Sequence, residues 1–174
     1  MADLPAIDHG LMIEHLNAHE GGIHKLKSYQ GMVTNNDLRD IIHLQENIMR
    51  THVWIMLAFI HPDYHQDIEL PPLSTDSKKQ YVEKEGSAGT DLNKWIALEA
   101  HNTAKNMSNT NFHSALMMKD PKVKKAHIQM ALQQLEIKDK YEDFLKGMGW
   151  DFVSNISVQE RIKTYLHFQH LLNL

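Results

Sequence analysis

The sequence predicts an all-α fold, more specifically a ferritin-like antiparallel four-helix bundle with one long crossover connection and a short fifth C-terminal helix. Three observations favour this fold. Four long segments repeat their apolar residues at helical spacing, segments typical of strands are nearly absent, and the connections are short, long and short in turn. With 174 residues and 42% hydrophobic content, the chain is expected to form a single domain over residues 1–174.

The first two helices are predicted over about residues 8–31 and 36–60. Asp8 stands where a helix N-cap is expected, and the turn between the two helices is too short for anything but antiparallel neighbours. The second helix ends before Pro62, since the residue before a proline disfavours helical geometry. Its apolar stripe is the clearest periodic signal in the chain and consists of Leu38, Ile41, Ile42, Ile48, Met49, Ile55, Met56 and Phe59.

A connection rich in proline and glycine follows over residues 62–89, and it is long enough to run back along a whole helix. The third helix is predicted over about 91–118. Asp120 and Pro121 combine a cap with a proline at the first helical position, so the fourth helix is expected over about 121–146, before a glycine stop. Two hairpins joined by one crossover form the ferritin-like arrangement.

A short fifth helix is predicted over about residues 158–172. Ser157 and Glu160 match a capping box, in which the two side chains satisfy each other's backbone N–H groups. Ile162 and Leu166 then continue an apolar stripe. We expect this helix to close one end of the bundle.

Composition and charge argue against several classes of partner. The chain has 18 Lys and Arg against 22 Asp and Glu and no basic stripe, so no nucleic-acid partner is expected. The longest apolar run, "VWIMLAFI" at residues 53–60, is far shorter than the roughly 20 residues that cross a bilayer, so no membrane span is expected. The start "MADLPAIDHG" lacks the order of a signal peptide, and the absence of cysteine excludes disulfides and thiolate sites.

The run at residues 53–60 is apolar on every helical face and therefore needs cover on all sides. The cover is either the rest of the same chain or a second subunit docked near Trp54, and the sequence leaves both open. A small-ligand carrier is a further possibility, although methionines at helical spacing are more often core residues. Its cavity would be lined by Met107, Met117, Met118 and Met130.

Candidate metal ligands are present but lack the pattern that a di-metal centre needs. In ferritin-like di-metal proteins, two helices each supply a glutamate and the other two each supply Glu-x-x-His. No glutamate in this chain is followed three residues later by histidine. We therefore expect no cofactor, and a nonstandard metal site has only weak candidates, namely Glu14, Glu20, His24, Glu46 and Glu99.

Nine of the 13 histidines fall into two groups. His52 lies on the apolar stripe of the second helix, and His127 falls on the fourth helix where Ile42 falls on the second, so both are expected to be buried and hydrogen-bonded. Histidines off the stripes or in loops are expected at the surface, namely His9, His19, His61, His65, His113, His167 and His170. No serine sits in a Gly-x-Ser-x-Gly elbow, so nucleophilic catalysis is not predicted.

The segment "AKNMSNTNFHSALMMKDPKVKKAHIQMALQQLEIKDKY" at Ala104–Tyr141 resembles the coat F domain of the spore coat protein F family. The likeness rests on "SAL" at residues 114–116, on the Asp120–Pro121 turn and on "HIQMALQQLE" at residues 127–136. It implies a ferritin-like bundle without catalytic residues, made in the cytoplasm and placed in the spore coat as a structural protein. Its partners are then other coat proteins or further copies of itself. The alternative is a divergent ferritin-like di-metal carboxylate protein, an oxidase or a protein of iron handling.

Overall fold

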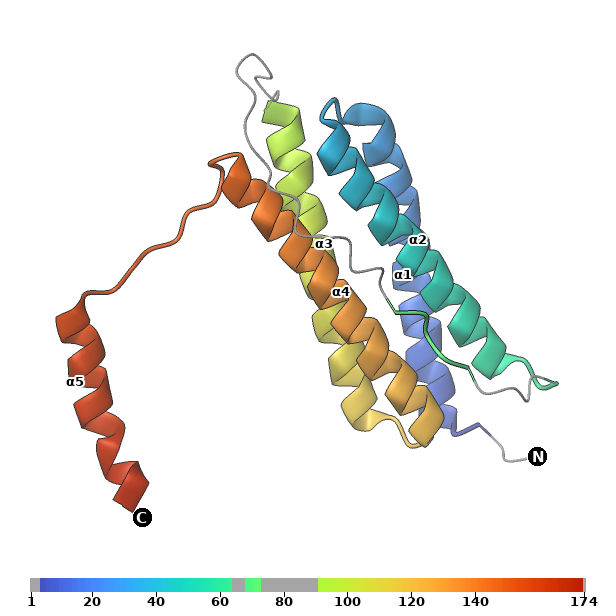
Figure 1. Cartoon of the computed structure of the whole chain (residues 1–174). Helices are drawn as coiled ribbons and strands as arrows, with labels where there is room; N and C mark the ends of the chain where they lie inside the picture. The colour runs from blue at the N-terminus through green and yellow to red at the C-terminus, as the bar shows by residue number, and fades with distance from the viewer. Residues whose placement is uncertain (1–3, 64–67, 73–90, 174) are drawn as a thin grey trace.

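The structure, a computed structural model, describes residues 4–63, 68–72 and 91–173. Within these residues the chain is all-α, without strands, as Figure 1 shows. The elements are α1 (Ala6–Met32), α2 (Asn36–Ile60), α3 (Asp91–Met117), α4 (Pro121–Gly147), α5 (Val158–Phe168) and the 3-10 helix η1 (Gln169–Asn173). The prediction of an all-α chain is therefore confirmed. None of the described helices combines the length and the apolar character that a bilayer crossing requires.

The helices pair into two hairpins. α1 packs on α2 and α3 packs on α4, and the hairpins meet through contacts of α2 with α4 and of α1 with α3. In Figure 1, α2 and α3 both run from the top of the view to the bottom. Most of the expected crossover over residues 62–89 lies outside the described residues. In its described part Leu70 is buried, and the carbonyl of Pro71 accepts a hydrogen bond from Gln133 on α4 (2.7 Å).

Short-range hydrogen bonds explain where α2 and α4 begin. The side-chain oxygen of Asn35 accepts a hydrogen bond from the backbone N–H of Leu38 (3.0 Å). At the next hairpin, Asp120 accepts from the backbone N–H groups of Lys122 (2.8 Å) and Val123 (3.1 Å). These bonds satisfy N–H groups that the first helical turn leaves without partners. The cap predicted at the start of the fourth helix is therefore confirmed.

Asp8 has a different role from the predicted cap. α1 begins at Ala6, after Pro5, and no side chain caps it. Asp8 is fully buried, and its two carboxylate oxygens accept hydrogen bonds from the backbone N–H groups of Lys119 (2.9 Å) and Asp120 (2.8 Å). The carboxylate therefore holds the α3–α4 turn against the start of α1. The prediction of an N-cap was wrong because the partner of Asp8 lies on the other hairpin, which the local sequence does not reveal.

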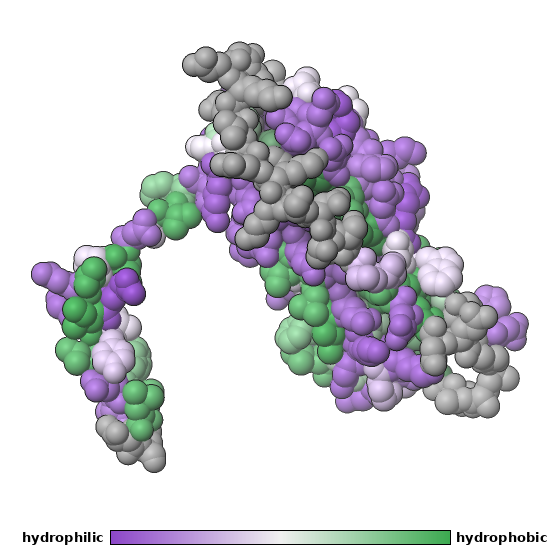
Figure 2. Space-filling model, in the orientation of Figure 1, coloured by the Kyte–Doolittle hydropathy of each residue, from purple (hydrophilic) through white to green (hydrophobic). Residues whose placement is uncertain are grey.

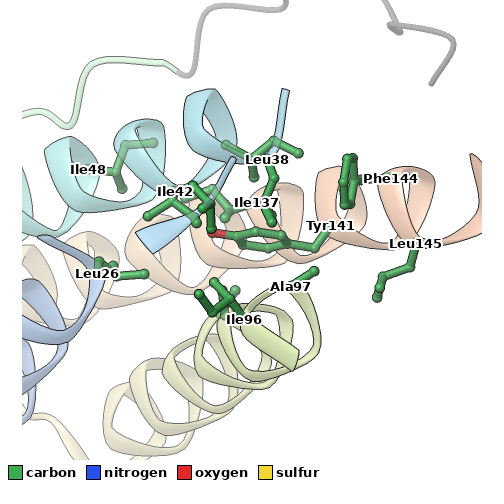
Figure 3. Close-up of a cluster of buried hydrophobic side chains, with 14 of the residues drawn as sticks. Leu26, Leu38, Ile42, Ile48, Ile96, Ala97, Ile137, Tyr141, Phe144 and Leu145 are labelled. Atoms are coloured by element: carbon green, nitrogen blue, oxygen red, sulfur yellow. The ribbon is translucent and has the colours of Figure 1, made fainter. Parts of the chain in front are cut away.

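Two apolar clusters fill the interior at different heights of the bundle. The larger one surrounds Tyr141, with Ile42, Ile96 and Ile137 close to its ring in Figure 3. The hydroxyl of Tyr141 donates to Oε1 of Gln45 (2.9 Å), which satisfies a polar group inside this apolar region. The second cluster contains Met12, Ile55, Met56, Leu70, Met118, Val123, Ala126 and Met130. Burying such side chains stabilises the fold by about 1.5–3 kcal/mol each.

The prediction that the fifth helix closes the bundle is wrong. After α4 ends at Gly147, Gly149 adopts a left-handed φ of 66°, which glycine tolerates at no steric cost, and the chain turns. Trp150 still packs on the bundle, with its ring 5.9 Å from that of Phe144. Every residue from 151 to 172 is exposed, and Figure 1 shows α5 standing apart from the other four helices. Hydrophobic periodicity predicted the helix but carried no information about what it packs against.

Candidate functional site

The five candidate metal ligands do not gather in the bundle interior. Glu14, Glu20 and His24 are exposed on α1. Glu99 on α3 is half exposed, and its Oε1 accepts a hydrogen bond from Nζ of Lys25 (2.8 Å). Across the described ranges, no group of three or more His, Asp or Glu side chains is placed to hold a metal ion.

Glu46 is the buried member of that set, and its carboxylate already has partners. Arg50 donates two hydrogen bonds to Oε1 (2.9 and 2.7 Å), and Gln30 donates one to Oε2 (2.6 Å). Burial alone would raise the pKa of Glu46, but the hydrogen bonds from Arg50 and Gln30 outweigh burial and lower this pKa below its ordinary value. Through Gln30 the carboxylate connects α2 to the end of α1.

Four histidines form a compact group inside the bundle, called the histidine cluster below. His15 and His19 come from α1, His52 from α2 and His127 from α4, and all four are buried. The ring centroids are 5.2 Å apart for His15 and His127, 5.6 Å for His19 and His52, and 6.3 Å for His15 and His19. Along α1 and α2 the histidine cluster lies between the two apolar clusters. The middle of the bundle is therefore polar.

The prediction that His52 and His127 are buried is confirmed, whereas the prediction that His19 lies at the surface is wrong. His19 follows the buried Met12 by two helical turns and precedes the buried Leu26 by two more, so it shares their face of α1. This spacing was the available signal for its burial. Of the other histidines expected at the surface, His9, His61, His113, His167 and His170 are exposed, and His65 lies outside the described residues.

Each ring of the histidine cluster makes a hydrogen bond that holds its orientation. Two of the four bonds join α1 to α3 and α2 to α4, and so connect the two hairpins. The other two lie within α1 and within α4. The four bonds run from His15 Nε2 to Ser114 Oγ (2.9 Å), from His19 Nδ1 to the carbonyl of His15 (2.7 Å), from His52 Nε2 to Gln133 Oε1 (2.8 Å) and from His127 Nδ1 to the carbonyl of Val123 (3.0 Å).

Burial lowers the pKa of every histidine in the cluster. Desolvation is the largest cause at all four positions, because the interior disfavours a charged imidazolium, and neighbouring rings lower the pKa further. The pKa falls to about 4 for His15 and His19 and to about 3 for His52, and that of His127 is also lowered. The histidine cluster is therefore neutral at pH 7.

An apolar groove of about 390 Å³ lies between α1 and α2. Two of the candidate metal ligands, Glu20 and His24, belong to its walls rather than to the interior. Trp54 and Leu57 are each more than half exposed on α2, while Ile55 in the same run is fully buried. The complete lining is Leu16, Asn17, Glu20, Ile23, His24, Val53 and Leu57.

Residues 151–172 form a second unusual surface, called the C-terminal arm below. Ser157 and Glu160 make the predicted capping box, so a local signal starts α5. Figure 2 shows hydrophobic side chains along the whole arm, and Phe152 is 90% exposed. The exposed apolar residues of the arm are Phe152, Val153, Ile156, Val158, Ile162, Tyr165, Leu166, Phe168, Leu171 and Leu172.

No protein-family model, curated protein or solved structure matches the chain. The likeness of the α3–α4 hairpin to the coat F domain therefore rests on its residues alone. Three features of the described residues bear on function, namely the histidine cluster, the groove and the C-terminal arm.

Proposed function

We propose that the chain is a nonenzymatic assembly protein of the spore coat that self-associates through its C-terminal arm. The observation that carries the proposal is that residues 151–172 are all exposed although one face of their helix is apolar. The parallel course of α2 and α3 supports a ferritin-like bundle as the body to which the arm is attached. The spore-coat setting comes from the resemblance of Ala104–Tyr141 to the coat F domain.

The arm has the composition of a helix that docks on a partner. Its apolar residues Val158, Ile162, Tyr165 and Leu166 follow one another at spacings of four, three and one, which places them on one face. α5 has 11 residues, and an isolated helix of fewer than roughly 12–15 residues is only marginally stable in water. Docking on a partner stabilises such a helix by removing its apolar face from water. The opposite face carries Glu160, Thr164 and His167, and Arg161 and Lys163 lie at the two borders of the apolar face.

The chain itself offers an acceptor for this helix, which favours a second copy as the partner. The groove between α1 and α2 has apolar walls that include Ile23 and Leu57. Glu20 supplies a negative charge there, and the arm carries Arg161 and Lys163 beside its apolar face. An arm from one copy and a groove from another are complementary in both apolar character and charge. Repetition of this contact links many copies, as a coat requires.

A divergent di-metal carboxylate protein is not proposed. Glu14 and Glu20 are exposed, Glu99 pairs with Lys25, and Glu46 is held by neighbouring side chains. No observation among the described residues brings these acids to one centre.

Sedimentation velocity of the full chain over a range of concentrations tests the proposal. We expect concentration-dependent assembly that Ile162→Glu weakens at least tenfold, because burying an isoleucine is worth about 1.5–3 kcal/mol and 1.4 kcal/mol is a factor of ten. Thr164→Glu is the matched control, since it adds the same charge on the opposite face of α5. A full chain that stays monomeric up to about 100 μM, or equal effects of the two variants, would contradict self-association through the arm.

The coat setting needs a separate measurement. A fluorescent fusion expressed during sporulation of an endospore-forming bacterium is expected to collect at the spore surface. Diffuse fluorescence in the mother cell, together with normal assembly of the purified chain, would remove the coat role and leave self-association standing. Leu57→Glu in the groove should weaken assembly as Ile162→Glu does, because the two side chains lie on the two complementary surfaces.

A further inference from the structure

The hydrogen bonds around His19 and His52 determine which ring nitrogens carry protons. Nδ1 of His19 lies 2.7 Å from the carbonyl oxygen of His15, which can only accept, so this nitrogen is the donor. Nε2 of His52 lies 2.8 Å from Oε1 of Gln133. The orientation of that amide is set by its own Nε2, which donates to the carbonyl of Pro71 (2.7 Å). Nε2 of His52 is therefore a donor as well.

The remaining nitrogens of the two rings face each other with no proton between them. A neutral imidazole has a single N–H, so Nε2 of His19 and Nδ1 of His52 both present lone pairs. These two nitrogens are 3.4 Å apart. Turning either ring over would give up its hydrogen bond to an oxygen, so the rings cannot escape this contact without a loss elsewhere.

A shared proton would relieve the contact, but burial opposes it. His19 and His52 are both fully buried, and the interior disfavours the positive charge that a second proton would bring. The other species that satisfies two facing lone pairs is a metal ion that takes both as ligands. Neutral imidazole nitrogen is among the commonest ligands of copper and zinc in proteins.

We propose that Nε2 of His19 and Nδ1 of His52 bind a single Cu(I) ion between α1 and α2. With metal–nitrogen bonds of about 2.0 Å, nitrogens 3.4 Å apart subtend an angle of roughly 115° at the ion, close to the trigonal angle, so the ion takes one further donor besides this pair. Each ring also donates its other N–H to a protein oxygen, which is the outer support that ligating histidines generally have. The proposal departs from the expectation of a chain without a cofactor.

The surroundings favour Cu(I) over a divalent ion. Zinc takes four ligands, commonly three or four of them from protein, whereas no three His, Asp or Glu side chains of the described residues are placed to hold an ion. Cu(I) accepts fewer ligands and binds thioethers, and Met49 and Met56 lie about one turn on either side of His52, fully buried. A single charge also costs about a quarter as much to bury as a double charge, since the Born energy scales with the square of the charge.

His127 adds another lone pair to the same interior. Its Nδ1 donates to the carbonyl of Val123 (3.0 Å), so its Nε2 is an acceptor. That nitrogen is buried and has no hydrogen-bond partner. A buried acceptor without a donor costs about 1–3 kcal/mol, and a cation in the histidine cluster offsets part of this cost. The histidine cluster therefore has buried lone pairs without a hydrogen-bond donor, and such lone pairs are available to a metal ion.

Titration of the full chain with Cu(I), without oxygen and against a chromophoric chelator, is the first test. We expect one tightly bound Cu(I) per chain, with X-ray absorption showing nitrogen ligands near 2.0 Å. Zn(II) is the second probe and is expected not to displace it. Absence of tight Cu(I) binding, or displacement of Cu(I) by equimolar Zn(II), would overturn the proposal.

Variants locate the ion. His19→Gln and His52→Gln are each expected to lower the Cu(I) affinity at least 100-fold, whereas His113→Gln, at an exposed position of α3, should leave it unchanged. Removing a buried ring also destabilises the bundle, so nitrogen-15 NMR of the unmodified chain gives an independent measurement. At pH 7 without metal, His19 Nε2 and His52 Nδ1 should be unprotonated, and both resonances should shift with one equivalent of Cu(I). A proton on either nitrogen, or Cu(I) binding that leaves both resonances in place, would contradict the assignment of these two nitrogens as the ligands.

Discussion

Mild acid is expected to unfold the metal-free chain, because at pH 5 the histidines of the cluster are neutral in the folded chain and charged in the unfolded chain. The perturbation is a change from pH 7 to pH 5 with a metal chelator present. The pKa is about 4 for His15 and His19 and about 3 for His52 in the folded chain, against an ordinary histidine value of 6.5. Because these pKa values are depressed, the unfolded chain takes up protons below pH 6.5 that the folded chain does not. The stability that the neutral rings contribute is therefore complete above pH 6.5 and is lost as the pH falls toward 4.

The magnitude follows from these pKa values. At pH 5 the unfolded state gains about 2 kcal/mol for each of the three histidines, because the pH lies about 1.5 units below their unfolded pKa and each unit is worth 1.36 kcal/mol. The sum of about 6 kcal/mol is comparable with the whole stability of an ordinary domain, about 5–15 kcal/mol. Near pH 5.5 the slope reaches roughly 3–4 kcal/mol per pH unit. Glu46 and Glu142, whose pKa values are lowered from 4.5, lose their contributions only below this window.

Urea unfolding followed by far-UV circular dichroism at pH 7, 6, 5.5 and 5 measures the effect. His15→Gln removes one titrating ring and should reduce the loss at pH 5 by about 2 kcal/mol, whereas His113→Gln, at an exposed position, should leave the loss unchanged. A free energy of unfolding at pH 5 within about 1 kcal/mol of its value at pH 7 would refute the reasoning, since it would mean that the rings titrate as they do in the unfolded chain.

Three further outcomes are expected from chemical unfolding at pH 7. Asp8→Asn should destabilise the chain by about 2–3 kcal/mol, because one oxygen that accepts a backbone N–H is replaced by the NH2 group of an amide, which can only donate. An unchanged midpoint would contradict the burial of this carboxylate. Asp120→Ala should cost about 0.5–2 kcal/mol through the lost cap, and a smaller effect would remove that role. Gly21→Ala should stabilise α1 by about 1 kcal/mol, since nothing lies near the new methyl group. Gly22→Ala should stabilise it less, because the methyl group of Met49 lies 2.6 Å from the new Cβ. Equal stabilisation by the two variants would show that Met49 moves freely.

Local signals predicted the elements of this fold, and tertiary contacts decided what the sequence left open. The stripe on α2 and the Asp120–Pro121 pair depend on helical period and on capping, which short stretches of sequence contain. The role of Asp8 depends on a turn more than 100 residues away, and no local pattern reports that turn. The same holds for α5, whose capping box and periodicity are correct while its position relative to the bundle is not encoded in either.

The histidine cluster shows where reasoning by residue type fails. The sequence predicts His19 at the surface because it lies off the strongest apolar stripes, although it continues the face of Met12 and Leu26 on α1. Its burial is possible because the carbonyl of His15, one turn earlier on α1, accepts a hydrogen bond from its Nδ1. A single sequence does not show that the rings of the histidine cluster meet. The weak candidates for metal binding, four acids and His24, lie apart from one another, and solvent or neighbouring side chains already satisfy the four acids.

A polar middle between two apolar clusters also determines how the helices align. Leucine, isoleucine and methionine side chains tolerate a shift of one helix by a turn, since each can pack against many neighbours. The bonds from His15 to Ser114 and from His52 to Gln133 do not tolerate it, because a shift of 5.4 Å separates the partners. Each separated pair leaves buried groups unsatisfied at about 1–3 kcal/mol. The histidine cluster therefore selects one register of α1 against α3 and of α2 against α4, which the apolar clusters alone do not specify.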